Sequence, residues 1–583
     1  MTSCSDGSTH NFAPPVFQAI ISPPPTPPVT AAAVVAPPGV LLPTPTVAGE
    51  PGEPDSFNAS QTEILVTPPP TPESPDSGSA PGVISDVAVD GEFTLGAAPG
   101  VPESIVDAAR GLAQAVPHLF SWTEVDPANP TADVLLTVND GTPLAGWVYA
   151  VAVPFATVTD ETAWTSVTEG WQAGVSALGQ LMVDSETAAA LTATWGPSAT
   201  VQVVNDDFIG QVWAARPSWI IVPFERLRPE FKVIPIDGRS PLSRDFDLST
   251  YPLVLPITIK GQPQAVETFL ANWTGPAINY DPDKLTRVAM TGVTALVRAT
   301  AAQMERNGIQ WPGEEVAPIL RDADFAHVSN EVSFAADCPP PDPYGGTTFC
   351  SRDPYFELLE SIGANVIELT GNHVNDYGRD PMKRSLDMYA AAGMEWFGGG
   401  HDLADAQRAL LIDHNNNRIA FVGCNPVGPA NAWALADAAG SRPCGPDLLD
   451  QISRLRDEGY VVIATLQYIE HYVYHAPPDQ QRAFAELAAA GATAVSGSQA
   501  HHAQGFAFEN GSFIHYGLGN LFFDQMDMMG TRQTFIDTYY IYDGRLLNID
   551  LWTGLIESWA RPRVMTPEER ADLLRTVFAA SGW

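Results

Sequence analysis

The chain has 583 residues, and 68 acidic residues against 29 basic ones give it a net charge of −39. A surface this acidic repels nucleic acid and anionic lipid headgroups, which excludes a nucleic-acid-binding protein. No run of about twenty apolar residues occurs, so the sequence predicts no transmembrane helix. The length and the 45% hydrophobic content allow two or three domains, each with its own core.

Residues 1–85 are rich in Pro and Thr, with Pro-Pro-Pro-Thr-Pro-Pro at 23–28. Such a composition stays extended and hydrated and forms no core, so it predicts a disordered tether. Cys4, near the start, resembles the lipid-bearing residue of a mature bacterial lipoprotein. The resemblance implies an extracytoplasmic, cell-surface protein that meets the membrane only through a lipid anchor at Cys4. The alternative is an ordinary Cys near a disordered end.

Residues 90–265 alternate between strand-like and helix-like patterns, which predicts a first, smaller α/β domain. A helix is expected over 103–116, with Pro102 in its first turn. Strands are expected at 92–96, 134–138, 147–153, 218–225, 231–238 and 251–257.

The last three of these strands carry Ile-Val-Pro-Phe-Glu, Val-Ile-Pro-Ile-Asp-Gly and Tyr-Pro-Leu-Val-Leu-Pro, in that order. This order is similar to the type-2 periplasmic solute-binding fold, particularly its phosphate-binding relatives. The resemblance implies a domain that binds a small ligand. The Ser/Thr-Gly loop with which those relatives cradle phosphate is not evident here. An α/β domain that binds nothing small is the alternative.

Residues 285–570 alternate strands and helices throughout, which predicts a layered α/β domain. The expected strands are 287–296, 365–369, 418–424, 461–467, 494–496 and 512–516, and the expected helices are 355–362, 382–392, 448–458 and 480–490. Nine of the eleven His residues lie between His327 and His515, so this domain is where the chemistry is expected.

Asn372 and His373 directly follow an apolar run at 364–369, which predicts a buried strand. In open α/β sheets, ligands bind at the carboxyl ends of the strands. An amide oxygen beside an imidazole nitrogen suits a divalent metal or a phosphate oxygen. The alternative is a strand-to-loop turn with a hydrogen-bonded His.

Five segments of this domain together resemble the CapA family, named for the poly-γ-glutamate capsule protein, and the resemblance covers 287–526. They are Met-Thr-Gly-Val-Thr-Ala-Leu at 290–296, Ser-Asn-Glu-Val at 329–332, Gly-Asn-His-Val-Asn-Asp-Tyr-Gly at 371–378, Thr-Leu-Gln-Tyr at 465–468, and 497–525 with Gly-Leu-Gly-Asn at 517–520. The resemblance implies a calcineurin-like metallophosphoesterase fold. That fold is a four-layer α/β/β/α sandwich with a metal centre at the strand ends.

The resemblance also implies roles for individual residues. Asn372 and His373 match the family's Asn-His pair and are the expected catalytic residues, with His373 as an acid or a donor to a phosphate oxygen. The expected metal ligands are Glu331, Asn372, Gln467, Gln499 and His501.

Three positions depart from the family pattern. Val293 stands where the family has Asp, and Gln467 and Gln499 stand where it has His. Because these changes remove one carboxylate and two imidazoles, they weaken transition-metal binding. The sequence therefore favours one harder divalent metal (Mn²⁺, Mg²⁺ or Ca²⁺), or none, over a two-metal centre.

Residues after Leu466 offer partial compensation for the lost ligands. On a continuing strand, residues 467, 469 and 471 share a face, which places His471 beside Gln467. Glu470 then faces the other way, unless the strand has already ended. His502 and His515 are also near in the sequence, and for all three His residues a hydrogen-bonding role at the surface or in the core is favoured over a ligand role.

The remaining four Cys form two close pairs in the sequence, Cys338 with Cys350 and Cys424 with Cys444. None of them shows the spacing of a zinc site. Two local disulfides are expected in an oxidising compartment, and four unpaired thiols are the alternative.

These observations lead to two hypotheses about function. In the first, the chain is a cell-envelope protein of the CapA family, involved in the synthesis of capsule, poly-γ-glutamate or another surface polymer. Its degenerate metallophosphoesterase-like site would act on that polymer or on a phosphorylated or peptide-like small substrate. In the second, it is a non-catalytic ligand-binding or scaffold protein that uses the solute-binding-like domain. The sequence leaves open whether the chain is an enzyme.

Overall fold

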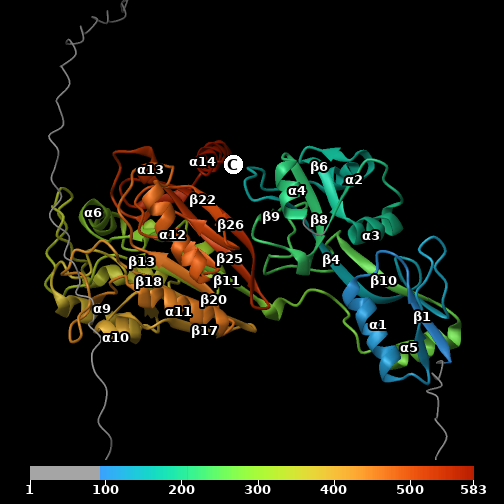
Figure 1. The fold of residues 1–583 in the computed structure, drawn as a ribbon. Coiled ribbons are helices and arrows are strands. Elements are labelled where there is room, and N and C mark those ends of the chain that lie inside the picture. Colours follow the sequence, from blue (N-terminus) through green and yellow to red (C-terminus); the bar gives the residue numbers. More distant parts are fainter. Residues whose placement is uncertain (1–91, 206–207) are drawn as a thin grey trace, which may run out of the picture. The chain divides into compact units, whose positions relative to one another are not determined.

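The computed structural model describes residues 92–205 and 208–583 (Figure 1). The tether expected over 1–85 and the lipid anchor expected at Cys4 lie outside these residues. All described residues fall in one compact unit of the chain. Among them, no helix has both the length and the apolar composition needed to cross a bilayer.

The N-terminal part of this unit is built on a ten-stranded sheet in the order β2-β1-β3-β10-β4-β8-β6-β5, with β7 beside β6 and β9 beside β4. Its strands are β1 (Phe93–Ala97), β2 (Phe120–Trp122), β3 (Val134–Val138), β4 (Thr142–Pro154), β5 (Val175–Ser176), β6 (Gly179–Asp184), β7 (Gln202–Val204), β8 (Ser218–Pro223), β9 (Phe231–Val233) and β10 (Val254–Gly261). The 13-residue β4 pairs with β10, β8 and β9 and so joins the two halves of the sheet.

Five α-helices accompany this sheet. They are α1 (Glu103–Ala115), α2 (Trp164–Ala173), α3 (Ser185–Trp195), α4 (Phe208–Ala214) and α5 (Pro263–Asn272), with a 3₁₀ turn η1 (Phe224–Arg226). Helix α1 buries Ile105, Ala109 and Ala113, which are four residues apart and therefore share one face. Helix α3 starts at Asp184, whose carboxylate accepts a hydrogen bond from the Thr187 amide.

Two further sheets form the C-terminal part. A nine-stranded sheet has the order β15-β14-β13-β11-β25-β26-β27, with β12 and β24 attached, and a six-stranded sheet has the order β17-β18-β20-β21-β23-β22. The first contains β11 (Leu285–Thr291), β12 (Val293–Thr294), β13 (Phe325–Asn330), β14 (Val366–Glu368), β15 (Glu395–Phe397), β24 (Asn520–Phe522), β25 (Gln533–Tyr542), β26 (Arg545–Glu557) and β27 (Arg561–Val564). The second contains β17 (Leu410–His414), β18 (Asn417–Cys424), β20 (Val461–Leu466), β21 (Ala494–Ser496), β22 (Phe506–Glu509) and β23 (Ser512–His515), and β16 (Gly399–Gly400) pairs separately with β19 (Gly440–Ser441).

The helices of this part are α6 (Arg298–Asn307), α7 (Ala317–Asp322), α8 (Phe356–Ser361), α9 (Arg379–Ala391), α10 (Leu403–Ala406), α11 (Pro446–Asp457), α12 (Pro478–Ala490), α13 (Met529–Arg532) and α14 (Pro567–Ala580), with 3₁₀ turns η2 (Pro282–Lys284), η3 (Trp311–Gly313) and η4 (Asp353–Tyr355). Helix α14 begins with a capping box in which Thr566 and Glu569 satisfy each other's backbone amides.

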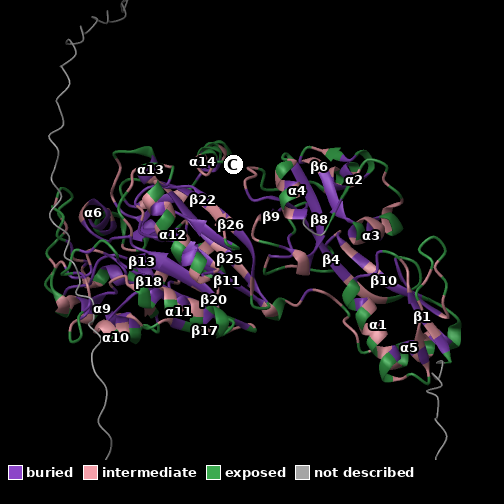
Figure 2. Ribbon diagram, in the orientation of Figure 1, coloured by how far each residue is buried: buried purple, intermediate pink, exposed green. Residues whose placement is uncertain are grey.

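Three hydrophobic cores separate the layers of the C-terminal part. Phe421 on β18 and Ile463 on β20 pack with Met290 on β11 and Phe535 on β25, so the two sheets face each other. Their outer faces are covered by helices, and this is why the neighbouring Val422 belongs to a separate core with α11 and α12. The core strands are buried while the helices expose their outer sides (Figure 2). This arrangement confirms the expected α/β/β/α sandwich.

A buried carboxylate links the two sheets. Glu368 at the end of β14 accepts hydrogen bonds from His327 Nε2 (3.0 Å) and Thr370 Oγ1 (2.6 Å), and from Ser498 Oγ just beyond β21. The Thr291 amide donates to His327 Nδ1, so the imidazole carries its proton on Nε2 and donates it to Glu368. Burial raises the pKa of Glu368, but these donors outweigh it and the pKa is lowered, which keeps the carboxylate ionised.

Most expected strands and helices match the structure to within a few residues, and 134–138 and 494–496 match β3 and β21 in both bounds. The strand expected over 287–296 is wrong in one respect, because it is broken at Gly292. A Cβ there would lie 1.9 Å from the Gly519 carbonyl oxygen, so only glycine fits this close approach of two backbones. Pro102 precedes α1 as its N-cap instead of lying in its first turn.

Both expected disulfides are present. Cys338 bonds to Cys350, and Cys424 at the end of β18 bonds to Cys444. The cysteines of the first pair are 12 residues apart in the sequence and those of the second pair are 20 residues apart, so each disulfide closes a short loop.

We therefore expect Cys338, Cys350, Cys424 and Cys444 to give no free thiol in denatured protein that has not been reduced. Thiol titration after reduction should recover all four and serves as the control. Four free thiols from this region before reduction would show that the pairs do not form.

We expect Glu368→Leu to lower the free energy of unfolding by about 3–5 kcal/mol, because it leaves three buried donors unpartnered. The pKa of Glu368 is lowered from 4.5, so its contribution is present above that pH and is lost as the pH falls through the folded-state value. Denaturant unfolding at pH 7 and at acid pH measures both effects. Glu395→Leu, at an exposed position of neighbouring β15, should change stability by less than about 0.5 kcal/mol. Equal losses in the two variants would contradict the role of Glu368.

Candidate functional site

The candidate site lies where parallel strands of both sheets end. Glu331 follows β13, Asn372 follows β14, Gln467 follows β20 and His501 lies beyond β21. In the nine-stranded sheet β13 and β14 are parallel, and in the six-stranded sheet β20 and β21 are parallel. Their carboxyl ends therefore carry these side chains to one edge of the sandwich.

Glu331 is the buried anionic group of the site. It is 1% exposed, and neither of its carboxylate oxygens has a hydrogen-bond partner. A Cβ on Gly371 would lie 2.8 Å from the Glu331 Cα, so the glycine lets the Gly-Asn-His loop pass directly over this carboxylate. Two motifs far apart in the sequence meet at this contact.

His501 stands next to Glu331, with Nε2 3.9 Å from the Glu331 Oε2. On its other side, His501 Nδ1 lies 2.7 Å from the Asn520 Oδ1. The Asn520 amide nitrogen donates to the carbonyls of His501 and Thr531, which directs its oxygen at the imidazole. Asn520 therefore holds a proton on Nδ1 and turns Nε2 towards the carboxylates.

A second carboxylate, Glu470, lies 3.5 Å from His501 Nε2. Tyr472 donates a hydrogen bond to Glu470. His471 does not follow Gln467 on a continuing strand, because β20 ends at Leu466 and the following loop presents Glu470 instead. His471 lies beside Asp479, 3.7 Å away. In the sequence, only knowledge of where β20 ends could have indicated that Glu470 lies in the site.

Asn372 and Gln467 contact each other across the two sheets. Gln467 Nε2 donates to the Asn372 Oδ1 at 3.2 Å, and Gln467 Oε1 has no partner. His373 pairs with Asp376 at 2.6 Å and packs on the Phe349 ring, with 20% of its side chain exposed. These contacts leave His373 at the solvent side of the site.

Gln499 is turned partly away from the other residues of the site. Its Nε2 donates to Ser329 Oγ at 2.7 Å, and its Oε1 has no partner. The two other His residues have structural roles. His515 is bonded to the buried Asp537, and His502 to the Ala503 carbonyl.

Neighbouring charges shift the pKa values of His501 and the groups around it. Burial lowers the pKa of His501, but Glu470 and Glu331 outweigh it and raise the pKa to about 9. The hydrogen bond from the His501 imidazole lowers the pKa of Glu470 to about 2. Burial raises the pKa of Glu331, and the two imidazoles nearby lower it only in part. Burial also lowers the pKa of His373, but Asp376 and Glu331 outweigh it and raise it. At neutral pH the site thus holds an imidazolium between two carboxyl groups.

A two-metal centre does not fit these residues. Val293 is fully buried in β12 and has no ligating atom. Over residues 92–205 and 208–583, no three His, Cys, Asp or Glu side chains are arranged to hold a metal ion. The unpartnered oxygens of Glu331, Gln467 and Gln499 are the donors that a single hard cation would find here.

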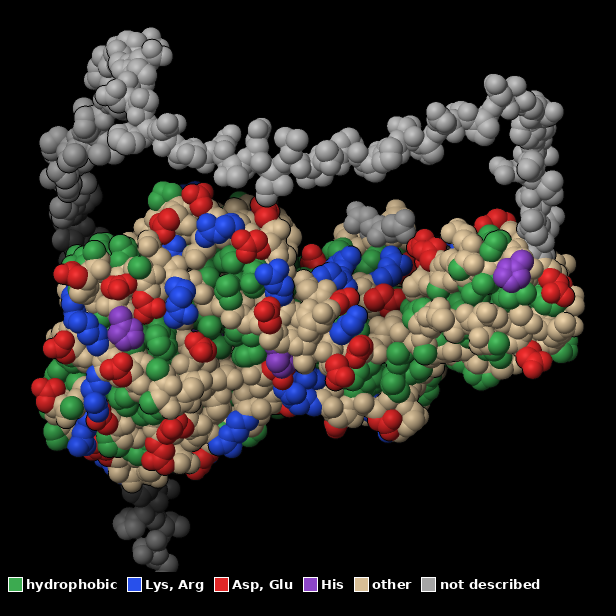
Figure 3. Space-filling view, turned by 90° about the horizontal axis from the view of Figure 1, so that it is seen from below, with side chains coloured by type: hydrophobic (Ala, Val, Ile, Leu, Met, Phe, Trp, Pro, Cys, Tyr) green, Lys and Arg blue, Asp and Glu red, His purple; other side chains and the backbone are tan. Residues whose placement is uncertain are grey.

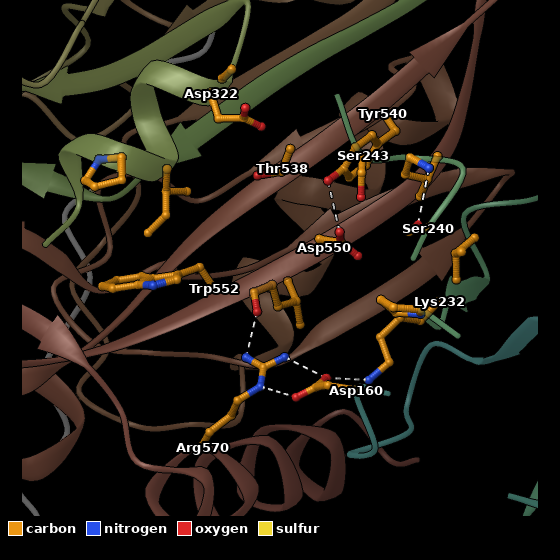
Figure 4. Close-up of a pocket in the computed structure, with 17 residues that line it drawn as sticks. Asp160, Lys232, Ser240, Ser243, Asp322, Thr538, Tyr540, Asp550, Trp552 and Arg570 are labelled. Atoms are coloured by element: carbon orange, nitrogen blue, oxygen red, sulfur yellow. Dashed lines mark hydrogen bonds and ion pairs between the residues drawn. The ribbon is translucent and has the colours of Figure 1, made fainter. Parts of the chain in front are cut away.

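A cavity of about 520 Å³ shares no residue with this cluster (Figure 4). Within it, Asp160 accepts from Lys232 Nζ at 2.9 Å and from Arg570 Nε at 2.6 Å, and Arg570 also donates to the Leu551 carbonyl. These three charged side chains therefore already pair with one another. On the face drawn in Figure 3, acidic and basic side chains are intermixed, and no basic patch for nucleic acid stands out there.

Residues 287–525 match the family model described as "Bacterial capsule synthesis protein PGA_cap". Over this segment the chain is similar to the CapA family. It is 24% identical over 302 residues to the capsule biosynthesis protein CapA of Bacillus anthracis, covering 49% of this chain and 72% of that protein. It is also 24% identical over 282 residues to the PGA biosynthesis protein CapA of Bacillus subtilis, covering 47% and 73%.

Among solved structures, an ABC-type phosphate transport receptor from Vibrio cholerae is similar to this chain with 17% identity and a TM-score of 0.26, over 32% of this chain and 94% of the receptor. Because this TM-score is low, the N-terminal part is described by its own strand order and not by this similarity. The site residues Glu331, Asn372, His373, Gln467, Gln499 and His501 all lie within the CapA segment.

We expect Glu331→Gln to raise the free energy of unfolding at pH 7 by about 1–3 kcal/mol, because it removes a buried carboxylate whose oxygens have no partner. Denaturant unfolding measures this gain. Glu368→Gln is the matched control, since the same change at a buried glutamate with three donors should lower stability. A loss of stability in Glu331→Gln as large as in Glu368→Gln would contradict the geometry described here.

Proposed function

We propose that this chain acts in the biosynthesis of a cell-surface polymer of the capsule type, and that the site around Glu331 meets the polymer or its precursor. The names of its relatives from Bacillus anthracis and Bacillus subtilis, a capsule and a PGA biosynthesis protein, support this role. The matched segment contains every strand end that contributes to the site.

One observation carries the proposal of a working site: the Glu331 carboxylate is buried with both oxygens unpartnered. Buried polar atoms are normally hydrogen-bonded, and leaving one unpartnered costs free energy. Packing does not require a carboxylate at this position. A group that is expensive for folding and surrounded by polar side chains is the kind that function retains.

The proposed chemistry is hydrolysis or transfer at a phosphoester or peptide-like bond. His501 is placed to move a proton at Nε2, because Asn520 holds its ring from the other side. Asn372 and the partly exposed His373 would contact the substrate oxygens, and Glu331 and Glu470 would balance the charge of the imidazole. All the groups to which these roles are assigned are side chains of this chain.

A non-catalytic binding or scaffold role is the second candidate. Val293, Gln467 and Gln499 favour it, because they replace ligands that the metal chemistry of the family's fold would use. In this case the site would still bind the polymer but would not turn it over.

We further propose that the protein works outside the cytoplasm and is anchored through a lipid at Cys4. The two disulfides support an oxidising compartment. The composition of residues 1–85 supports a spacer between an anchor and the folded part.

The test is complementation of a polymer-producing strain that lacks its own copy of this gene. We expect the unaltered chain and the Glu395→Gln control to restore surface polymer, and Asn372→Ala and Glu331→Gln to restore less than about a tenth of it, because each removes a polar group at the centre of the site. Polymer is measured after release from the cell surface, with equal protein levels confirmed by immunoblot. Full restoration by both site variants would overturn the proposed site.

Purified protein distinguishes the two candidates. Phosphoester and polymer cleavage are measured with and without added Mn²⁺, together with the metal content. Turnover that Asn372→Ala abolishes would rule out the scaffold role, and polymer binding without turnover would rule out the enzyme.

A further inference from the structure

A second cavity, of about 1020 Å³, is lined chiefly by the N-terminal part of the described chain and is far more acidic than the first. Its carboxylates are Glu103, Asp184, Glu186, Glu225, Asp281 and Asp543, and its cations are Arg226 and Lys284. None of the residues of the Glu331 site lines it. Its volume is that of a site for a small organic molecule.

The features that would bind an anion in this cavity are already used by its own carboxylates. Asp184 caps helix α3, accepting from the Thr187 amide at 2.8 Å, and also pairs with Arg226 at 3.0 Å. Glu186 accepts a hydrogen bond from the backbone amide of Glu103 in the first turn of α1. Lys284 lies 3.5 Å from Asp543. Both helix N-termini and both cations are therefore occupied, and the negative charge is left in excess.

The Glu225 carboxylate is held by neutral donors that leave its charge in place. Trp147 Nε1 donates to it at 3.0 Å, and the Asn279 side-chain amide donates to its other oxygen. Burial raises the pKa of Glu225, which shows that its ionised form lacks a full counter-charge.

A fully buried hydroxyl on β4 also lacks a hydrogen-bond partner, although it does not line the cavity itself. Tyr149 is fully buried and its hydroxyl has no hydrogen-bond partner. Tyr149 lies two residues after Trp147 on β4, so both side chains point to the same face, where Trp147 lines the cavity. Burial raises the pKa of Tyr149, and the charges of Glu186 and Glu225 raise it further.

The walls of the cavity are partly aromatic. Trp147, Tyr280 and Tyr542 supply aromatic surface, which attracts ammonium groups through the faces of the rings and packs against methylene chains. Within the described residues no cluster of His, Cys, Asp or Glu has the geometry to hold a metal ion, so a bare metal does not match these carboxylates. We propose that this cavity binds an organic polyamine, an aliphatic chain that carries two or more ammonium groups.

The titration of Glu186 gives this binding a pH dependence. Burial and the neighbouring Asp184 and Glu225 raise the pKa of Glu186 to about 7, against the opposing effects of Arg226 and the Glu103 amide. Tyr149 faces the same group from β4. Because Glu186 gains its charge as the pH rises through 7, polyamine affinity should increase from pH 6 to pH 8.

Calorimetric titration of the full chain with spermidine at 0.15 M salt and pH 8 tests the proposal. We expect one site per chain, at least tenfold weaker binding in Glu186→Gln and in Glu225→Gln, and no binding of inorganic phosphate. Glu169→Gln, an exposed carboxylate on α2 outside the cavity, makes the same change in net charge and should alter affinity less than twofold. Thermal unfolding confirms that each variant is folded.

Two results would overturn the proposal. Many weak sites that are equally reduced in all three variants would show that spermidine binds only to the general charge of −39. Binding of phosphate in place of spermidine would show that the cavity takes anions. Neither result bears on the Glu331 site, because that site shares no residue with this cavity.

Discussion

The hydrogen bonds to Glu368 are the constraint on which the site depends. This carboxylate belongs to the nine-stranded sheet, yet it accepts from Ser498, which follows β21 of the six-stranded sheet. The two sheets are thereby fixed to each other at their carboxyl edge and not only through the apolar core between them. Residues that follow the same strand ends form the site: Glu331 after β13, Asn372 after β14, and His501 after Ser498. A small shift of one sheet against the other would separate them.

A second network sets the direction of the imidazole. Asn520 begins β24, which pairs with β12, so its position is determined by the strand that carries Val293. Val293 has no ligating atom, but its pairing with Asn520 supports the hydrogen bond from His501 to Asn520. The strand pairing therefore keeps an oriented imidazole facing a buried carboxylate.

Periodicity in the sequence was enough to predict a layered α/β domain and most of its strands, and the resemblance to the CapA family implied the four-layer sandwich. The apolar runs of β18, β20 and β21 lie between two layers of helix and sheet, where each residue must be apolar, and the pattern is unambiguous. The Asn-His loop was also predictable, because its ligands follow such a strand directly. Glu470 was not, since the alternation of a strand carries no mark of where the strand ends, and one residue of error reverses the face. Gly292 was missed for a related reason, because the contact that forbids a side chain there comes from Gly519, over two hundred residues away.

The acidic cavity could not have been predicted at all. Its carboxylates come from α1, β6, α3, η1, the segment before β11 and the turn between β25 and β26, and nothing in their sequence spacing relates them. Strand motifs similar to those of the solute-binding fold implied a small ligand without its charge, whereas the carboxylates that the fold assembles outnumber the cations. Backbone topology and ligand charge are separate properties, because the topology is set by buried apolar residues and the charge by polar residues at strand and helix ends. The same separation holds in the C-terminal part, where the site residues lie at the strand ends of the sandwich. In both parts, the exposed ends of the secondary structure decide what the protein can bind, and the core decides only where those ends meet.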